Sequence, residues 1–368
     1  MKIPLVDLKA QYLSMKKEID EAIQKIIDNT SFIMGPQVKE FEEDLAKFCN
    51  CKYAIGVSSG TSALFLALKA YGIKEGDEVI TVPNSFIATA EAIIQCRAKP
   101  VFVDVDDKTM LMDVKKLENA ITKKTKAIIP VHLYGQICDM DSIIKLAKKH
   151  NLIILEDAAQ AIDSEYKGKK LPIHETAIFS FFPAKNLGCY GDGGAVITNN
   201  DDIAKAVAKL RDHGRIGKYE SDIIGYGERL DALQAAILNA KLKHLPEWTT
   251  KRREHAKKYG ELLKGVKEIS LPFEEKYSKH VYYMYIIRIS KRDELLNYLK
   301  EKEIFCGIHY SIPLHIQPAL SYLGCKQGDF PISEKAAKEI LSIPMYPELT
   351  DEQIKHVVEN IKNFFKKA

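Results

Sequence analysis

The sequence predicts an α/β fold with a mostly parallel central sheet flanked by helices, and a smaller C-terminal α/β domain. Through much of the chain, short apolar runs alternate with segments of helical spacing, which is typical of parallel strands joined by right-handed helical crossovers. Runs such as 128–131 lack polar–apolar alternation, as expected of strands covered on both faces. At 368 residues the chain is long for one core, so we expect a large domain over residues 1–245 and a small one over 246–368.

Two helical segments precede the first strand. Apolar residues at helical spacing predict a helix over Tyr12–Asp28, which Gly35-Pro36 ends. A second helix follows, with Val38, Phe41 and Leu45 on one face.

Strands and helices then alternate along the chain. The predicted strands are Tyr53–Val57, Glu78–Val82, Val101–Val105, Ala127–Val131 and Leu152–Leu155. The predicted helices are Thr61–Tyr71, Phe86–Gln95, Val114–Ile121 and Met140–His150. This order predicts a doubly wound sheet, in which ligands bind beyond the carboxyl ends of the strands.

The pattern changes near Pro246, where we place the start of the small domain. Its predicted elements are a charged helix over Thr250–Lys264, a strand over Tyr282–Ile289, a helix over Asp293–Lys302, a strand over Ile304–Tyr310 and a terminal helix over Asp351–Lys366.

Composition narrows the class of protein. The 54 Lys and Arg residues against 50 Asp and Glu give a net charge of +4 without a concentrated basic face, so we expect no nucleic-acid partner. No apolar run approaches the ~20 residues that span a bilayer, so we expect no membrane partner. The seven cysteines form no C-x-x-C pair, which predicts neither a disulfide framework nor a metal site. Met1–Pro4 lead directly into polar sequence, so we expect no signal peptide and a cytoplasmic location.

Three groups of polar residues follow predicted strands. The first is Ser58–Ser62, at the start of a predicted helix, whose unpaired N–H groups and positive dipole end favour an anion. Gly60 lets the backbone approach that anion, and Thr61 and Ser62 add hydroxyl groups. Serine or threonine at this place is more often a simple helix cap. Because no Walker lysine or G-x-G-x-x-G motif is present, the segment predicts a phosphate site without a nucleoside triphosphate or dinucleotide.

The second group is Glu156-Asp157, which ends a predicted central strand. Neighbouring strand residues point to opposite faces, so the two acids have different roles. A buried acid is costly unless it is paired. Asp157 is either the cap of the next helix or an acid that faces a cationic ring nitrogen. Pyridoxal phosphate needs such an acid, because its protonated pyridine ring is the electron sink.

The third group is centred on Lys185, which follows an aromatic strand and Pro183. A single lysine in a turn is by default a surface residue. Here a strand-end Asp157, an anion site and the hydroxyl of Ser180 accompany it. Burial lowers the pKa of a lysine amine, which makes the amine a Schiff-base former and a proton shuttle. The three groups together predict a pyridoxal-phosphate site.

Six segments of the chain together resemble the DegT/StrS-type sugar aminotransferases. This family has the fold type I architecture of the aspartate aminotransferase superfamily. The segments occur in the family's order over nearly the whole chain: SGTSAL (59–64), FIATAE (86–91), PVHLYG (130–135), EDAAQ (156–160), SFFPAK (180–185) and RLDALQAA (229–236).

The resemblance implies a cofactor site and a reaction. Lys185 would carry pyridoxal 5′-phosphate as a Schiff base, Asp157 would pair with the ring nitrogen, Gln160 would bind the ring hydroxyl and Phe86 would stack on the ring. The phosphate would be held by Gly60, Thr61, Ser62 and Ser180. The reaction would move an amino group from L-glutamate to a UDP-, dTDP- or GDP-linked keto-sugar, for the amino sugars of a surface polysaccharide or glycoconjugate. A homodimer with shared active sites is also implied.

Residues 307–318 and Arg229 resemble the branch that acts on 3-keto sugars. In that branch Arg229, His309 and Tyr310 would lie near the sugar, and an arginine that binds a carboxylate adds a uronic acid to the candidates. The structural alternative is that Arg229 forms an ion pair at an interface and that His309 is a hydrogen-bonded histidine at the end of a strand. A 4-keto-sugar aminotransferase and a non-catalytic regulatory protein stay open as alternatives. Relatives that dehydrate sugars carry histidine in place of the lysine, which disfavours that reaction.

Three further positions bear on the family pattern. Gly227 stands where relatives carry an asparagine that reaches across a dimer to the cofactor phosphate, so that contact is lost or is replaced by backbone N–H. Tyr283 stands where histidine is common. His132 matches the pattern, and we interpret it as a packed structural histidine.

Overall fold

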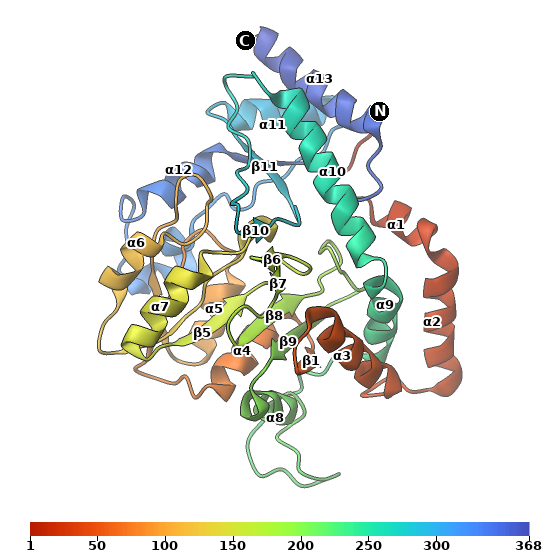
Figure 1. Ribbon diagram of the computed structural model, residues 1–368, viewed down its shortest axis with the longest axis vertical. Coiled ribbons are helices and arrows are strands. Elements are labelled where there is room, and N and C mark those ends of the chain that lie inside the picture. Colours follow the sequence, from red (N-terminus) through yellow and green to blue (C-terminus); the bar gives the residue numbers. More distant parts are fainter. Residues whose placement is uncertain (368) are drawn as a thin grey trace.

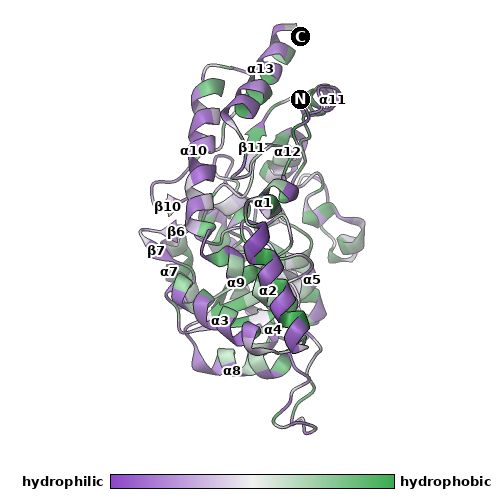
Figure 2. Cartoon of the chain, turned by 90° about the vertical axis from the view of Figure 1, so that its right-hand side faces the viewer, coloured by the Kyte–Doolittle hydropathy of each residue, from purple (hydrophilic) through white to green (hydrophobic). Residues whose placement is uncertain are grey.

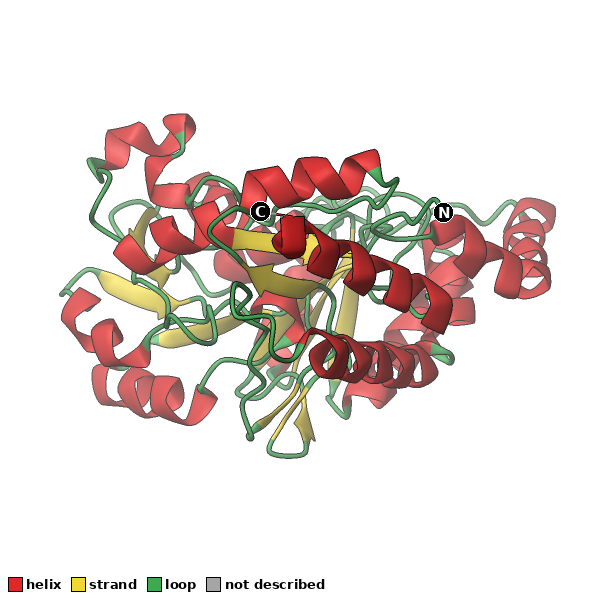
Figure 3. Cartoon of the chain, turned by 90° about the horizontal axis from the view of Figure 1, so that it is seen from above, coloured by secondary structure: helices red, strands yellow, loops and turns green. Residues whose placement is uncertain are grey.

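The computed structural model describes residues 1–367, which fold around a seven-stranded sheet with helices on both of its faces (Figure 3). In sheet order the strands are β1 (Tyr53–Val57), β9 (Gly194–Thr198), β8 (Thr176–Ser180), β5 (Ile153–Asp157), β4 (Thr125–Ile128), β2 (Glu78–Thr81) and β3 (Lys99–Phe102). From β8 to β3 all neighbours run parallel, while β9 is antiparallel to both β1 and β8. The predicted mostly parallel sheet is confirmed.

Alternating strand residues feed two separate cores. On one face Val79, Leu155 and Ile178 pack with helices α4 (Gly60–Ala70), α5 (Ala88–Gln95) and α8 (Asp201–Leu210). On the other face Ile80 and Ile154 pack in a core whose helices are α2 (Lys16–Asn29), α3 (Pro36–Cys49), α7 (Met140–His150) and α9 (Ala232–Leu242). This two-sided burial explains why the strands are apolar at successive positions.

A smaller group of elements lies at the upper end of Figure 1. They are α10 (Leu245–Leu263), β11 (Tyr285–Arg288), α11 (Arg292–Glu301), β12 (Ile340–Ile343) and α13 (Asp351–Lys367). Their core also includes Ile3, which pairs with Ile304 across the chain. The predicted division at residue 245 stays a prediction, and the packing of Ile3 shows that the first residues contact the C-terminal part.

The remaining elements are short. They are α1 (Leu8–Ser14), α6 (Val114–Leu117), α12 (Pro331–Glu339), the 3-10 turns η1 (Glu118–Ala120), η2 (Leu133–Gly135), η3 (Leu314–Ile316) and η4 (Pro318–Leu323), and the strands β6 (Glu165–Tyr166), β7 (Lys169–Lys170) and β10 (Ser278–Lys279). Seen from the side, the visible faces of α2 and α10 are largely hydrophilic (Figure 2). Within residues 1–367, no helix combines the length and the apolar character needed to cross a membrane.

Two sequence predictions are corrected. The segment 12–28 is not one helix, because the backbone leaves the helical region at Met15, between α1 and α2. Residues 304–310 are not a strand: only Ile304 and Gly307 pair, with Ile3 and Ser342. The chain then leaves the small sheet, whose second strand is β12. This departure turns the next residues toward the central sheet.

Candidate active site

A cavity of about 450 Å³ lies at the carboxyl ends of β5 and β8, beside the first turn of α4. Nine of the residues singled out from the sequence line it: Gly60, Thr61, Phe86, Asp157, Gln160, Ser180, Lys185, His309 and Tyr310. They come from five separate stretches of the chain. The crossover topology brings them together, because parallel strands end at the same edge of the sheet.

Lys185 lies in a tight turn that follows β8, and its N–H donates to the carbonyl of Phe182 over 2.8 Å. Its amine lies 4.4 Å from the centre of the Tyr283 ring. Burial lowers the pKa of Lys185 to about 8, against an opposing attraction by Asp157. An amine with this pKa is neutral in a substantial fraction of molecules near neutral pH, so it can act as a nucleophile and as a base.

Asp157 ends the central strand β5 and is buried. The hydroxyl of Thr89 donates to one carboxyl oxygen over 2.8 Å, and the N–H of Ala159 donates to the other over 3.2 Å. Burial raises the pKa of Asp157, and these two hydrogen bonds oppose the rise. These two hydrogen bonds orient the carboxyl group, and a cationic group in the cavity would stabilise it as an anion.

Glu156 points to the opposite face of the sheet and is fully buried. Its carboxylate lies 3.0 Å from Nε2 of His132, whose Nδ1 accepts the N–H of Cys138 over 3.3 Å. The hydrogen-bond pattern therefore makes Nε2–H the donor to Glu156. This pair lies away from the cavity, as expected for a structural histidine.

The first turn of α4 packs flush against β8 and β9. The hydroxyl of Ser59 accepts the N–H of Ser62 over 3.0 Å and caps the helix. A Cβ atom at Gly60 would lie 2.7 Å from Cβ of Ser180, and one at Gly194 would lie 2.4 Å from the backbone of Ser59. Glycine at both positions therefore allows the helix start, with its N–H groups, to face the cavity.

The hydroxyl of Ser62 points elsewhere. It donates to the carboxylate of Glu228 over 2.6 Å, and the hydroxyl of Ser58 donates to the same oxygen. Ser62 is absent from the cavity lining of the described residues. Its assignment to the cofactor phosphate stays a prediction.

Gln160 and Tyr310 form one hydrogen-bonded unit on the cavity wall. The side-chain oxygen of Gln160 accepts the N–H of Tyr134 over 2.7 Å, and its amide nitrogen donates to the Tyr310 hydroxyl over 3.2 Å. The Tyr310 ring lies 5.7 Å from that of Phe86, which is 53% exposed. An aromatic face is therefore open to the cavity.

His309 is held from two sides. Its Nδ1 lies 2.7 Å from the hydroxyl of Ser342, and its carbonyl accepts the Tyr134 hydroxyl over 2.5 Å. Burial, together with the positive charge of Lys185, lowers the pKa of His309 to about 4. Its imidazole is therefore neutral in the cavity at neutral pH.

Arg229 lies outside this cavity. Its guanidinium donates to Asp212 over 2.8 Å, and its backbone pairs with Val57. It lies near the C-terminal end of the loop between α8 and α9, which projects from the molecule at the bottom of Figure 1. A contact with substrate would require a second copy of the chain, so this role stays a prediction.

Some residues of the cavity were not assigned a role from the sequence. Thr89, which holds Asp157, lies three residues after Phe86, and that helical spacing is the signal that could have identified it. Tyr283 was noted only as a departure from the family pattern. No local pattern indicates that its ring contacts Lys185.

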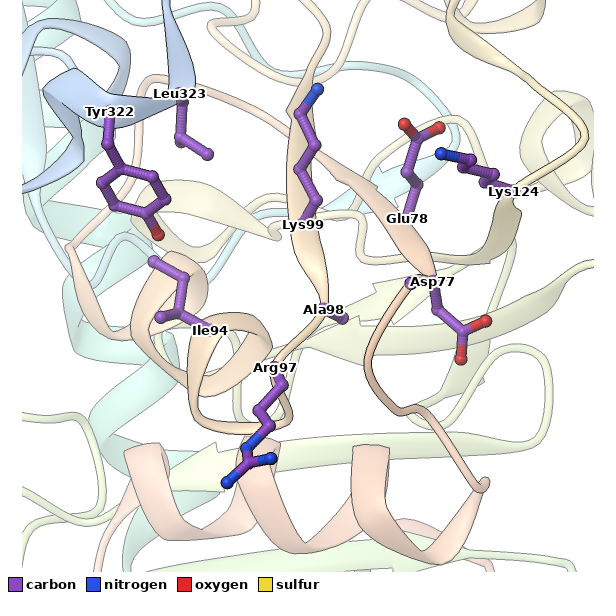
Figure 4. A pocket seen from close by; sticks show the side chains of 10 residues that line it. Asp77, Glu78, Ile94, Arg97, Ala98, Lys99, Lys124, Tyr322 and Leu323 are labelled. Atoms are coloured by element: carbon purple, nitrogen blue, oxygen red, sulfur yellow. The ribbon is translucent and has the colours of Figure 1, made fainter.

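A second cavity of about 450 Å³ lies at the opposite, amino-terminal ends of β2 and β3. Figure 4 shows that basic and acidic side chains alternate around it and point in different directions. They are Arg97, Lys99, Lys124, Asp77 and Glu78. This mixed set does not converge on one point, and we do not assign it a ligand.

Comparisons with known proteins agree with this geometry. A model of the DegT/DnrJ/EryC1/StrS aminotransferase family matches residues 13–362. A pleiotropic regulatory protein of Geobacillus stearothermophilus is 47% identical, over 100% of this chain and 99% of its own. The UDP-2-acetamido-2-deoxy-3-oxo-D-glucuronate aminotransferase of Pseudomonas aeruginosa is 41% identical, over 98% and 100%. The crystal structure of S. venezuelae DesV in complex with a ketimine intermediate superposes with a TM-score of 0.97 at 38% identity, over 99% and 98%.

Proposed function

Because the chain belongs to the DegT/DnrJ/EryC1/StrS aminotransferase family, we propose that it transfers the amino group of L-glutamate to the C3 keto carbon of a nucleotide-linked sugar. It is a pyridoxal-phosphate-dependent aminotransferase. The observation that carries the proposal is the position of the Lys185 amine and the Asp157 carboxyl in one cavity, beside the start of α4.

The residues of the cavity fit this cofactor. Lys185 offers an amine of lowered pKa for the aldehyde, and Asp157 offers a buried acid for the ring nitrogen. The exposed face of Phe86 suits a flat ring. Because α4 packs against β8 at Gly60 without an intervening side chain, the N–H groups at the start of α4 can bind a phosphate.

When bound, pyridoxal phosphate would supply a protonated conjugated ring that accepts the electron pair left on Cα when its proton is removed. Asp157 would keep the ring nitrogen protonated, and Thr89 orients Asp157 through its hydrogen bond. The amine of Lys185 would hold the cofactor until the donor displaces it. The freed amine would then take up the proton of Cα of glutamate and pass it to the cofactor. With the keto-sugar the same amine would move a proton in the opposite direction.

The choice of a 3-keto sugar rests on two supports. The Pseudomonas aeruginosa relative acts, by its name, on a 3-oxo sugar. The neutral imidazole of His309 and the hydroxyl of Tyr310 lie on the cavity wall, where a sugar hydroxyl could hydrogen-bond to them. Arg229 from a second copy would favour a sugar carboxylate, which keeps a uronic acid among the substrates.

We also propose a homodimer with shared active sites, in the cytoplasm. The loop between α8 and α9 exposes large apolar side chains that a monomer would leave in water, with Tyr219 and Ile224 each 90% exposed. Further exposed apolar residues, Phe32, Ile33 and Met34, lie close to the end of this loop, because Ile33 pairs with Asp231. A patch of this kind favours association with a second copy.

The test uses the full chain loaded with pyridoxal phosphate. Adding L-glutamate is expected to change the visible absorbance of the bound cofactor and to release stoichiometric 2-oxoglutarate. The Lys185→Ala variant is expected to lose turnover, while Lys257→Ala, at an exposed lysine of α10, keeps it. An unchanged spectrum with no 2-oxoglutarate would contradict the proposal. A panel of UDP-, dTDP- and GDP-linked 3-keto and 4-keto sugars then identifies the acceptor.

A second candidate is a regulatory protein that retains the fold without turnover. The name of the Geobacillus stearothermophilus relative favours it. The buried Lys185 amine of lowered pKa beside Asp157 suits proton transfer as well as cofactor binding, which favours the enzyme. The glutamate assay separates the two, since a regulator would bind the cofactor and release no 2-oxoglutarate.

A further inference from the structure

Tyr283 precedes β11 and lines the active-site cavity with only 8% of its surface exposed. The amine of Lys185 lies over its ring, 4.4 Å from the ring centre. A cation within about 6 Å of an aromatic face is attracted by the negative charge density of that face. The ring therefore offers the amine a resting position inside the cavity.

The backbone around Tyr283 is held in place by a buried arginine. The guanidinium of Arg252 donates to the carbonyls of Tyr282 and Tyr283 over 3.2 and 3.4 Å, and to that of Met345 over 3.0 Å. A Cβ atom at Gly135 would lie 3.1 Å from the Tyr283 nitrogen, so glycine there allows the close approach. The backbone that carries the ring is thus held in place by contacts within the protein.

The titratable groups around the Lys185 amine come from four parts of the chain. They are Asp157 at the end of β5, His309 after α11, Tyr283 before β11, and, on the same cavity wall, Tyr310 and Asp192. Burial lowers the pKa of Lys185 while Asp157 raises it. Asp157 would pair with the ring nitrogen of a bound cofactor and would then attract the amine less, while the aromatic face of Tyr283 would stay available to the protonated amine.

We propose that Tyr283 is a positioning residue that holds the free, protonated amine of Lys185 over its ring while that amine carries a proton. The inference rests on the proposed function, which makes Lys185 the proton carrier. An aromatic face attracts an ammonium ion without accepting a directed hydrogen bond from it, so the amine stays placed and can still move to the reacting carbon.

The test measures the pKa of the Lys185 amine in the cofactor-free full chain. Competitive acetylation across pH, followed by mass spectrometry of the peptide that contains Lys185, reports the pH midpoint at which the amine becomes reactive. Tyr283→Leu removes the ring and is expected to lower this midpoint by on the order of half to one pH unit, because the ammonium form loses its attraction. Tyr283→Phe keeps the ring and is expected to leave the midpoint unchanged. Exposed Lys17 serves as the reference in the same digest.

The inference is overturned if the Leu variant keeps or raises the midpoint, or if the Phe variant shifts as far as the Leu variant. Circular dichroism checks that each variant is folded, and Tyr283→Met replaces the Leu variant if that one is not. Failure of the glutamate assay in the unsubstituted protein would overturn the proposed function. It would not change the acetylation midpoints, because these are measured in cofactor-free protein. The two failures are therefore distinguishable.

Discussion

Asp157 and Glu156 are adjacent in the sequence and have opposite surroundings. Glu156 is fully buried and satisfied by His132 and by the backbone N–H groups of Ile173 and His174. Asp157 is held by Thr89 and Ala159 but has no basic partner within salt-bridge distance among residues 1–367. An acid that is oriented and has no salt-bridge partner is prepared for a ligand that carries a positive charge.

Replacing Asp157 by Asn tests this role. The amide retains the shape and loses the negative charge, so the cofactor's ring nitrogen loses its partner. We expect kcat to fall on the order of 100-fold or more, with the fold unchanged. Steady-state kinetics with glutamate measure the effect. Thr89→Val, which removes only the orienting hydroxyl, is the comparison variant, and a loss as large as that of the Asn variant would show that orientation and not charge is decisive.

The contact between α4 and β8 decides whether the N–H groups at the start of α4 are accessible to an anion. Because Cβ atoms at Gly60 and Gly194 would overlap with neighbouring strands and turns, the helix start lies against the sheet without an intervening side chain. Packing between elements also places His309. Backbone pairing with the small sheet ends at Gly307, and the chain then turns so that His309 lines the cavity. Both features depend on packing between elements.

Gly60→Ala should therefore affect the site by displacing the start of α4, although the substitution removes no side-chain contact. Displacing the helix start is expected to cost about 1–3 kcal/mol of stability and to weaken the binding of pyridoxal phosphate. Chemical denaturation and a fluorescence titration of cofactor-free protein measure the two effects. Gly260→Ala, inside α10 with only the Tyr285 hydroxyl at 3.8 Å, is the control and should add about 0.4–1 kcal/mol. Equal behaviour of the two variants would refute the packing argument.

At the scale of the whole molecule, the exposed loop between α8 and α9 predicts how two copies associate. Ile224→Glu places a charge at a 90% exposed apolar position and is expected to shift a dimer toward monomer. Sedimentation velocity measures the shift. Tyr322→Glu, at a 66% exposed aromatic residue of η4, is the control and should remain dimeric. A dimer that survives the Ile224 substitution would place the interface elsewhere.

Mixing two inactive variants tests whether the active site is shared. If Arg229 acts in the partner's site, Lys185→Ala and Arg229→Ala are each defective, and mixed dimers of the two contain one complete site. Equal mixing after reversible dissociation is then expected to restore about a quarter of the unsubstituted activity, because half of the dimers are mixed and each has one intact site. A mixture that stays as inactive as its components would place Arg229 in its own chain's site, and an Arg229→Ala variant of full activity would place it outside any site.

Local patterns in the sequence predicted many of the elements. The strand over Tyr53–Val57 and the helix over Met140–His150 occur with the predicted bounds. Both are short segments with a clear apolar pattern, and the helix is bounded by the capping residues Asp139 and Asn151. The pattern did not reveal β9, which inserts between β1 and β8. Strand order depends on pairing between residues far apart in the chain, and no local pattern encodes it.

By itself the sequence determined which residue types are available for the chemistry: a lysine after an aromatic strand, an acid at a strand end and a glycine at a helix start. These follow from backbone periodicity and turn residues, which are local. Only the tertiary structure decided that Ser62 faces Glu228, that Arg229 lies outside the cavity and that Tyr283 meets Lys185. The contact of Ser62 with Glu228 joins residues 166 positions apart, and Lys185 and Tyr283 are likewise distant in the chain. Such contacts follow from how the elements pack and not from the order of the residues.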